Sequence, residues 1–201
     1  MNRLKINQRM IAGIGAGLVV LIGPSISAAH LVTTGMGPVY DGIGHFLLTP
    51  EDLVPVIALA LYAGLRGAVS GRRAMFLVPL AWFVGGMAGS MTGHTVSFPI
   101  SAISFLILGG LVAADLYLPN AAVTALAMVL GIAHGFVNGA VLKDGAGMLG
   151  LVGIMTILFI LITLTSALVV SLKRPWTNIV VRVAGSWIAA TGMLMIGWAI
   201  R

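Results

Sequence analysis

Long apolar stretches, interrupted by short polar or basic segments, dominate the chain. A helix needs about 20 apolar residues to cross a hydrocarbon layer, and six stretches come close to that length. They cover about Glu51–Val69, Ala74–Met91, Phe98–Leu116, Ala121–Leu142, Met148–Leu172 and Asn178–Ile200. None alternates apolar and polar residues with the period of two that barrel strands require. The pattern predicts an all-α integral membrane protein, a bundle of six transmembrane helices.

A further apolar segment precedes this bundle and has two interpretations. Three basic residues lead into the run Ile11–Gly23, which is short for a full span. Ser27 and Ala29 are small residues at the two positions that a signal peptidase reads before His30. This predicts a cleaved signal peptide over residues 1–29 and a single polytopic domain over residues 30–201. The alternative is an uncleaved first helix, the seventh of the bundle.

Composition supports the membrane class and argues against nucleic acid as a partner. Of all residues, 59% are hydrophobic and only 8% are charged, so the chain cannot hide its apolar surface inside a soluble core. A formal net charge of +6 would suggest nucleic acid binding in a soluble chain. Here the cations lie in short clusters between apolar runs, so we expect the lipid bilayer as a partner and no nucleic acid. The lack of cysteine excludes disulfides and thiolate metal sites.

The basic clusters orient the predicted bundle. Nine cations collect on one side, namely Arg3, Lys5, Arg9, Arg66, Arg72, Arg73, Lys173, Arg174 and Arg182. Lys143 and Arg201 fall on the other side. By the positive-inside rule, the first side is cytoplasmic in a bacterial-type inner membrane. The four histidines then lie toward the outer side, and Asp115 lies on the inner side, where we expect it to pair with an arginine.

Three of the five acidic residues and one histidine fall within Tyr40–Asp52. A short interfacial helix over Val39–Leu48 would place Asp41 and His45 on one face, because they are four residues apart. A carboxylate and an imidazole so placed can hold a divalent ion.

Glu51 and Asp52 have two interpretations. They could join the same metal site as further carboxylate ligands. However, they follow Thr49 and Pro50, and that order also gives the N-cap, the first-turn proline and the first-turn acids of an ordinary helix start. Both interpretations stay open.

His134 and Asn138 form a second polar pair, four residues apart on the fourth predicted helix. Ionisable groups are costly when they face lipid, so we expect this pair to line the bundle interior. Glycines at every fourth position favour close helix contacts, and two such tracks are Gly131, Gly135 and Gly139, and Gly85, Gly89 and Gly93. His94 follows the second track. Such glycine faces could also join copies of the chain into a homo-oligomer.

These observations define one set of candidate metal ligands. The set contains His45, Asp41, Glu51, Asp52, His134, Asn138, His94 and His30. Imidazole and carboxylate ligands together suit nickel, cobalt, copper and zinc. We expect the metal to be a transported substrate, and we expect no permanent cofactor.

Two segments resemble a known family. Gly42–Leu53 resembles the first signature of the HupE/UreJ membrane proteins, a histidine followed six and seven residues later by an Asp-His pair that opens a helix. Gly131–Phe136 resembles their second signature, a glycine-flanked histidine in a later helix. The resemblance implies a small secondary permease for nickel or a related divalent metal, of the kind associated with hydrogenase or urease maturation.

The resemblance also implies roles for single residues. His45 and His134 match the family's histidines, and Glu51 matches its aspartate. Asp52 stands where the family has histidine, which leaves the identity of the metal open.

Two other functions stay open beside transport. Ser90 and His94, with Asp41 or Asp144, could assemble an intramembrane hydrolase. The chain could also be a non-transporting membrane subunit that assists metalloenzyme maturation. We expect transport without enzyme activity. Because the sequence has no nucleotide-binding Gly-x-x-x-x-Gly-Lys-[Ser/Thr] loop, we expect this transport to be passive, driven by a gradient, or driven by another subunit.

Overall fold

The computed structural model describes residues 33–92 and 99–200, and within these ranges all regular structure is helical. The helices are α2 (Pro38–Leu48), α3 (Pro50–Leu65), α4 (Ala68–Thr92), α5 (Ile100–Ala114), α6 (Asn120–Leu142), α7 (Gly147–Ser171) and α8 (Pro175–Ala199). The all-α prediction is confirmed for the described residues. The six predicted helices are present, and α2 is the predicted short helix before them. The predicted signal peptide over residues 1–29 lies outside the described residues.

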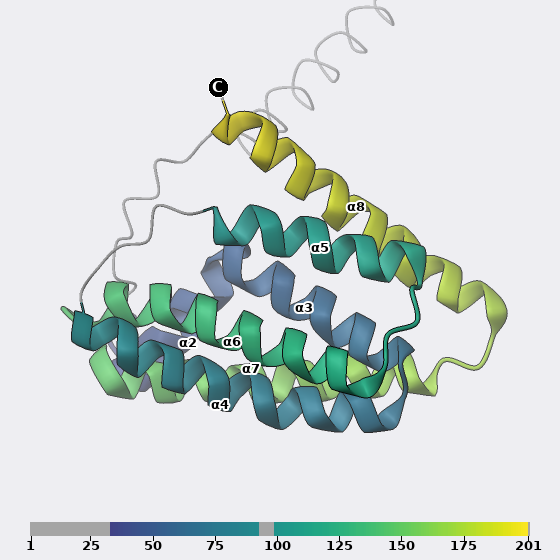
Figure 1. The fold of residues 1–201 in the computed structure, drawn as a ribbon. Coiled ribbons are helices and arrows are strands. Elements are labelled where there is room, and N and C mark those ends of the chain that lie inside the picture. Colours follow the sequence, from purple (N-terminus) through teal and green to yellow (C-terminus); the bar gives the residue numbers. More distant parts are fainter. Residues whose placement is uncertain (1–32, 93–98, 201) are drawn as a thin grey trace, which may run out of the picture. The chain divides into compact units, whose positions relative to one another are not determined.

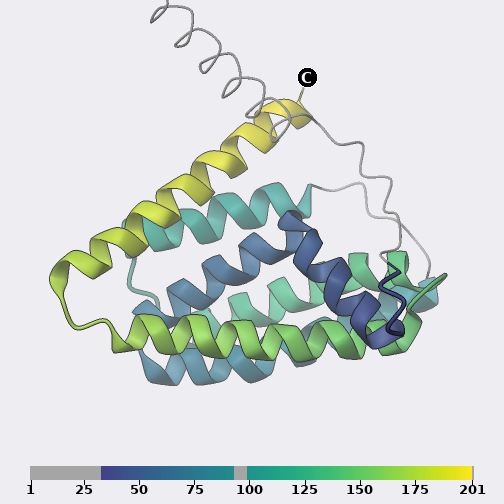
Figure 2. The same cartoon turned by 180° about the vertical axis from the view of Figure 1, so that it is seen from behind.

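The helix α3 lies at the centre of the bundle. It contacts α5 on one side and α4 and α7 on the other, and Figure 1 shows it between α5 and the layer that contains α4, α6 and α7. Val56, Ala58, Leu59, Tyr62 and Ala63 on α3 are all 0% exposed. Successive helices from α3 to α7 alternate in direction, as Figures 1 and 2 show. The short polar segment at the start of α3 is therefore carried into the bundle by the most buried helix.

The structure does not confirm the predicted count of six spans. Within the described residues, four helices are long and apolar enough to cross a membrane alone: α4, α6, α7 and Trp176–Ala199 of α8. The pair α2 and α3 counts as a fifth if it is one span bent by 78°. At 15 residues, α5 is shorter than an ordinary span.

Two helices begin earlier than the apolar runs predict. Gly67 adopts a φ of 100°, which separates α3 from α4, and α4 starts directly afterwards at Ala68. Arg72 and Arg73 therefore lie in the first turns of α4 and not in a loop. Similarly, α8 begins at Pro175, three residues before the predicted start, and Arg182 lies on this helix as it does on the predicted one. Long cationic side chains tolerate such positions because they can extend toward water from a helix end.

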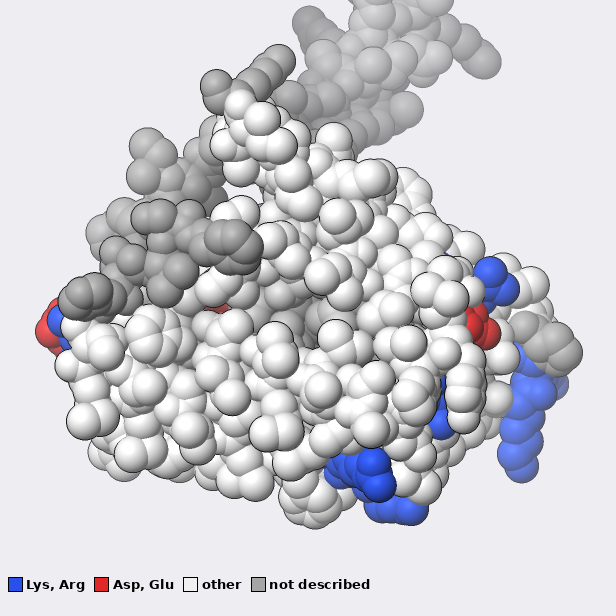
Figure 3. All heavy atoms as spheres, in the orientation of Figure 1, with Lys and Arg blue, Asp and Glu red and all other residues white. Residues whose placement is uncertain are grey.

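Basic side chains gather at one end of the bundle (Figure 3). This is the end where α3 and α7 finish and α4 and α8 begin. Its exposed cations are Arg72, Arg73, Lys173, Arg174 and Arg182. The middle of the face drawn in Figure 3 is almost free of charge. The predicted clustering of cations at one end is thus present among the described residues.

The predicted pairing of Asp115 with an arginine is confirmed. Arg66, directly after α3, forms an ion pair with Asp115, which ends α5 in the left-handed conformation with a φ of 51°. The Arg66 guanidinium also lies over the rings of Tyr62 and Tyr117, at 5.5 and 5.6 Å from their centroids. The Tyr62 hydroxyl donates to the Leu116 carbonyl at 2.8 Å. This cluster fastens α3 to α5 at the basic end.

Candidate functional site

The helices α4 and α6 approach each other closely because glycines face the partner backbone. A Cβ atom on Gly135 would overlap the Trp82 carbonyl oxygen, and one on Gly139 would overlap that of Gly86. In the other direction, a Cβ atom on Gly89 would overlap the backbone of α6. The first predicted glycine track therefore forms one helix contact with Gly85 and Gly89 of the second, whereas Gly93 lies outside the described residues. This contact fixes the position of the polar residues that α6 carries.

Asp52, His134 and Asn138 meet inside the bundle. Asp52, in the first turn of α3, is 7% exposed, and the two α6 residues are 2% exposed. His134 Nδ1 lies 2.7 Å from Asp52 Oδ1. Asn138 Nδ2 donates to Asp52 Oδ2 at 2.9 Å and to the His134 carbonyl at 3.0 Å. Each oxygen of the buried carboxylate thus has a partner, as buried polar groups require.

The partners of His134 determine where its ring proton lies. An ionised carboxylate only accepts hydrogen bonds, so the proton belongs on Nδ1 and is donated to Asp52. The other nitrogen, Nε2, lies 3.0 Å from Ser104 Oγ on α5 and accepts from its hydroxyl in the neutral ring. Trp82 stacks on the imidazole with centroids 5.6 Å apart, and Phe46 packs edge-on against Trp82. The imidazole is held at both nitrogens and on one face.

The amide oxygen of Asn138, Oδ1, accepts no hydrogen bond from the other residues of this cluster. It is buried and has no hydrogen-bond partner within residues 33–92 and 99–200. A buried polar atom without a partner costs about 1–3 kcal/mol. His45 on α2 lies beside Asn138 and interacts electrostatically with Asp52. The cluster therefore has an amide oxygen, without a hydrogen-bond partner among the described residues, that a cation could use as a ligand, and the His45 imidazole lies beside it.

Asp52 is more than an acid at a helix start. As predicted, Thr49 occupies the N-cap position of α3 and Pro50 follows it. The Thr49 hydroxyl, however, donates to the His45 carbonyl at 2.7 Å and does not cap the helix. The helix-start interpretation explains Glu51, which is exposed, but it does not explain a carboxylate buried against His134.

The two other predicted ligands that the structure describes, Asp41 and the exposed Glu51, do not join this cluster. Asp41 Oδ1 accepts hydrogen bonds from the hydroxyl and the backbone N–H of Thr34, at 2.7 and 2.6 Å. Among the residues that the structure describes, no group of three or more His, Cys, Asp or Glu side chains is placed to hold a metal. His30 and His94 lie outside the described residues. Metal binding by any of these residues stays a prediction.

Ser104 is the member of the cluster that the sequence did not reveal. The only signal was a serine inside the apolar helix Ile100–Ala114. Ser90, the serine considered for a hydrolase, instead donates to the Met87 carbonyl of its own helix at 2.8 Å. The structure thus brings a different serine to a histidine.

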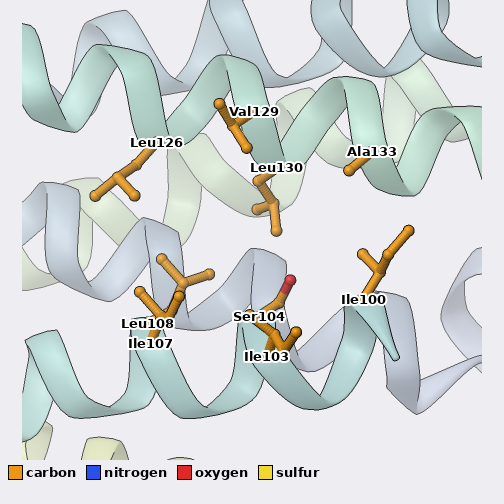
Figure 4. A pocket seen from close by; sticks show the side chains of 9 residues that line it. All are labelled: Ile100, Ile103, Ser104, Ile107, Leu108, Leu126, Val129, Leu130 and Ala133. Atoms are coloured by element: carbon orange, nitrogen blue, oxygen red, sulfur yellow. The ribbon is translucent and has the colours of Figure 1, made fainter. Parts of the chain in front are cut away.

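A groove of about 200 Å³ lies between α5 and α6 beside the cluster. It is lined by Ile100, Ile103, Ser104, Ile107, Leu108, Leu126, Val129, Leu130 and Ala133. Figure 4 shows Ser104 as the polar side chain of this lining, directed from α5 toward α6. Ser104 therefore connects the apolar groove to His134.

The family assignment rests on the length of the chain that one family model covers. The model described as HupE / UreJ protein matches residues 18–195, which include every member of the buried cluster. Comparison with curated proteins and with solved structures gives no match. The family match confirms the resemblance seen in the two signature segments. With its long apolar helices, the chain is a multi-pass membrane protein that belongs to the HupE/UreJ family.

Proposed function

We propose that this protein is a secondary permease for a divalent transition-metal cation, nickel or a related metal. The family is associated with uptake of nickel or other metals and with metalloenzyme maturation. The observation that carries the proposal is the buried cluster of Asp52, His134 and Asn138 with its unpartnered amide oxygen. Ionisable groups inside a membrane bundle are expensive, and they commonly mark the path of an ion.

The cluster offers the ligand types that such a metal accepts. A carboxylate oxygen, an imidazole nitrogen and an amide oxygen suit nickel, cobalt, copper and zinc. A cation would replace the proton that His134 Nδ1 shares with Asp52, and Asn138 Oδ1 would be its third protein ligand. The ring would then carry its proton on Nε2 and donate it to Ser104, so that the serine orients the metal-bound imidazole. Because protons compete for these ligands, uptake should fall in acid.

The position of the cluster supports uptake from the outer side. Asp52 lies in the first turn of α3, and Arg66 follows the last residue of that helix. The buried cluster therefore lies toward the end of the bundle opposite the one where the basic side chains gather. We place the basic end in the cytoplasm by the positive-inside rule, in a bacterial-type inner membrane. The cation then enters from the outer side past α2 and His45, driven by its own gradient or by another gradient.

Uptake of nickel into sealed vesicles that contain the purified protein tests this function. Asp52→Asn and His134→Ala should each reduce the uptake rate by about tenfold or more, because each removes a group that binds or orients the metal. Ser166→Ala is the control. Its hydroxyl is buried on α7 and, among the residues that the structure describes, bonds only to its own helix, so this variant should transport at the wild-type rate. Cobalt, copper and zinc measured in parallel identify the preferred metal.

Two results would contradict the proposal. Unchanged uptake in both cluster variants would place the pathway elsewhere in the bundle. A folded wild type that carries none of the four metals would exclude transport of these ions and favour a non-transporting role in metalloenzyme maturation.

A further inference from the structure

Ser104, His134 and Asp52 form a continuous line of hydrogen bonds. Ser104 Oγ lies 3.0 Å from His134 Nε2, and His134 Nδ1 lies 2.7 Å from Asp52 Oδ1. Asn138 holds the second carboxylate oxygen at 2.9 Å. A hydroxyl, a base within hydrogen-bond reach and an acid that orients the base are the components of an activated serine nucleophile.

The base in this line is His134. Its ring has the tautomer that a base needs here, with the proton on Nδ1, and its position is fixed by its neighbours. Because Nδ1 donates to Asp52, the lone pair of Nε2 points at the Ser104 hydroxyl. The stacked Trp82 ring and the tight backbone contact at Gly135 restrict movement of the imidazole. An oriented neutral imidazole next to a hydroxyl can remove its proton during attack.

The surroundings of Ser104 indicate the substrate class. Ser104 lines the groove between α5 and α6, and the other lining side chains are all apolar (Figure 4). Ile107 and Val129 on its walls are 49% and 66% exposed, so the groove is open to the outside of the bundle. An apolar groove with one hydroxyl in its wall fits an apolar chain that carries a single reactive polar group. A metal cation would find no ligand there except the hydroxyl.

We propose that Ser104 is a nucleophile that accepts the acyl group of an apolar-chain ester bound in this groove. Ser104 Oγ attacks the ester carbonyl carbon while His134 Nε2 takes the hydroxyl proton. The bond from that carbon to the alcohol oxygen breaks, and the alcohol leaves with the proton from Nε2. A water molecule then attacks the acyl carbon while Nε2 takes its proton. The bond from that carbon to Ser104 Oγ breaks, Oγ regains the proton from Nε2, and a carboxylic acid leaves. The activity goes beyond the proposed transport and does not depend on it.

An alkyl fluorophosphonate, applied to the purified full-length protein in detergent, tests this proposal. The reagent loses fluoride to an activated serine, and mass spectrometry of peptides locates the adduct. In the wild type we expect the adduct on Ser104. Asp52→Asn should slow its formation by about 100-fold or more, because the base loses its orienting acid. Ser90→Ala, which removes a hydroxyl bonded to its own helix, should react at the wild-type rate.

Either of two results would overturn the proposal. One is a folded wild type without an adduct on Ser104. The other is an adduct that forms equally fast in Asp52→Asn, since this would be ordinary hydroxyl reactivity. Because the adduct is mapped on the wild type, the first result does not depend on whether a variant folds. Nickel uptake, measured on the same wild-type preparation without the reagent, separates failure of this proposal from failure of the transport function.

Discussion

Asn138 holds the buried cluster together through both hydrogens of its amide. One goes to Asp52 and the other to the His134 carbonyl. Asn138→Ala should therefore lower the free energy of unfolding by about 1–3 kcal/mol, because it leaves Asp52 Oδ2 buried without a donor. Thermal unfolding in detergent measures this loss. Asn178→Ala, at an exposed position on α8, is the control and should leave the midpoint unchanged. Equal midpoints for both variants would contradict the role given to Asn138.

For single residues, the sequence could predict which side chains share a face of one helix, but not which side chains of different helices meet. The four-residue spacing placed His134 and Asn138 on one face, because helix geometry alone determines that relation. Asp52 lies 82 residues before His134, and Ser104 lies 30 residues before it. Their meeting depends on which helices pack together. The helix-start signal at Thr49 also left two interpretations of Asp52 open, because the same acids serve helix starts and buried sites.

Among the elements, the contact between α4 and α6 can be tested with a single methyl group. Gly139→Ala should destabilise the protein by about 1–3 kcal/mol, since the new Cβ atom would overlap the Gly86 backbone. Gly110→Ala on α5 is the control. A Cβ atom there has no neighbour within 4 Å, so the protein should be unchanged or about 0.5–1 kcal/mol more stable. Thermal unfolding of both variants measures the difference, and a stabilised Gly139→Ala would mean that α4 and α6 are not in close contact.

The apolar runs predicted where the helices lie better than where they end. Gly67 ends α3 with a positive φ, and a glycine at a helix end is a recognisable signal. Asp115 ends α5 in a similar backbone conformation, but its ion pair with Arg66 comes from a different helix. That end could not be predicted from the residues around it. The run Phe98–Leu116 consequently predicted a longer helix than α5.

For the whole molecule, the absence of cysteine allows the orientation to be measured directly. Asp144→Cys, in the exposed turn after α6, should react with a membrane-impermeant maleimide in intact cells. Lys173→Cys, in the exposed connection after α7, should react only after the membrane is permeabilised, because the basic end faces the cytoplasm. The reverse pattern would invert the proposed direction of metal entry.

The shortness of α5 has a consequence for the surrounding lipid. At 1.5 Å per residue, its 15 residues extend about 22 Å, whereas the 25 residues of α7 extend about 37 Å. A hydrocarbon layer of about 30 Å would be too thick along α5, and bilayers respond to such mismatch by local thinning. Thinning would draw lipid headgroups toward the membrane centre on the side of the α5–α6 groove. The ester groups of the bilayer itself would then lie closer to Ser104 than in an undisturbed membrane.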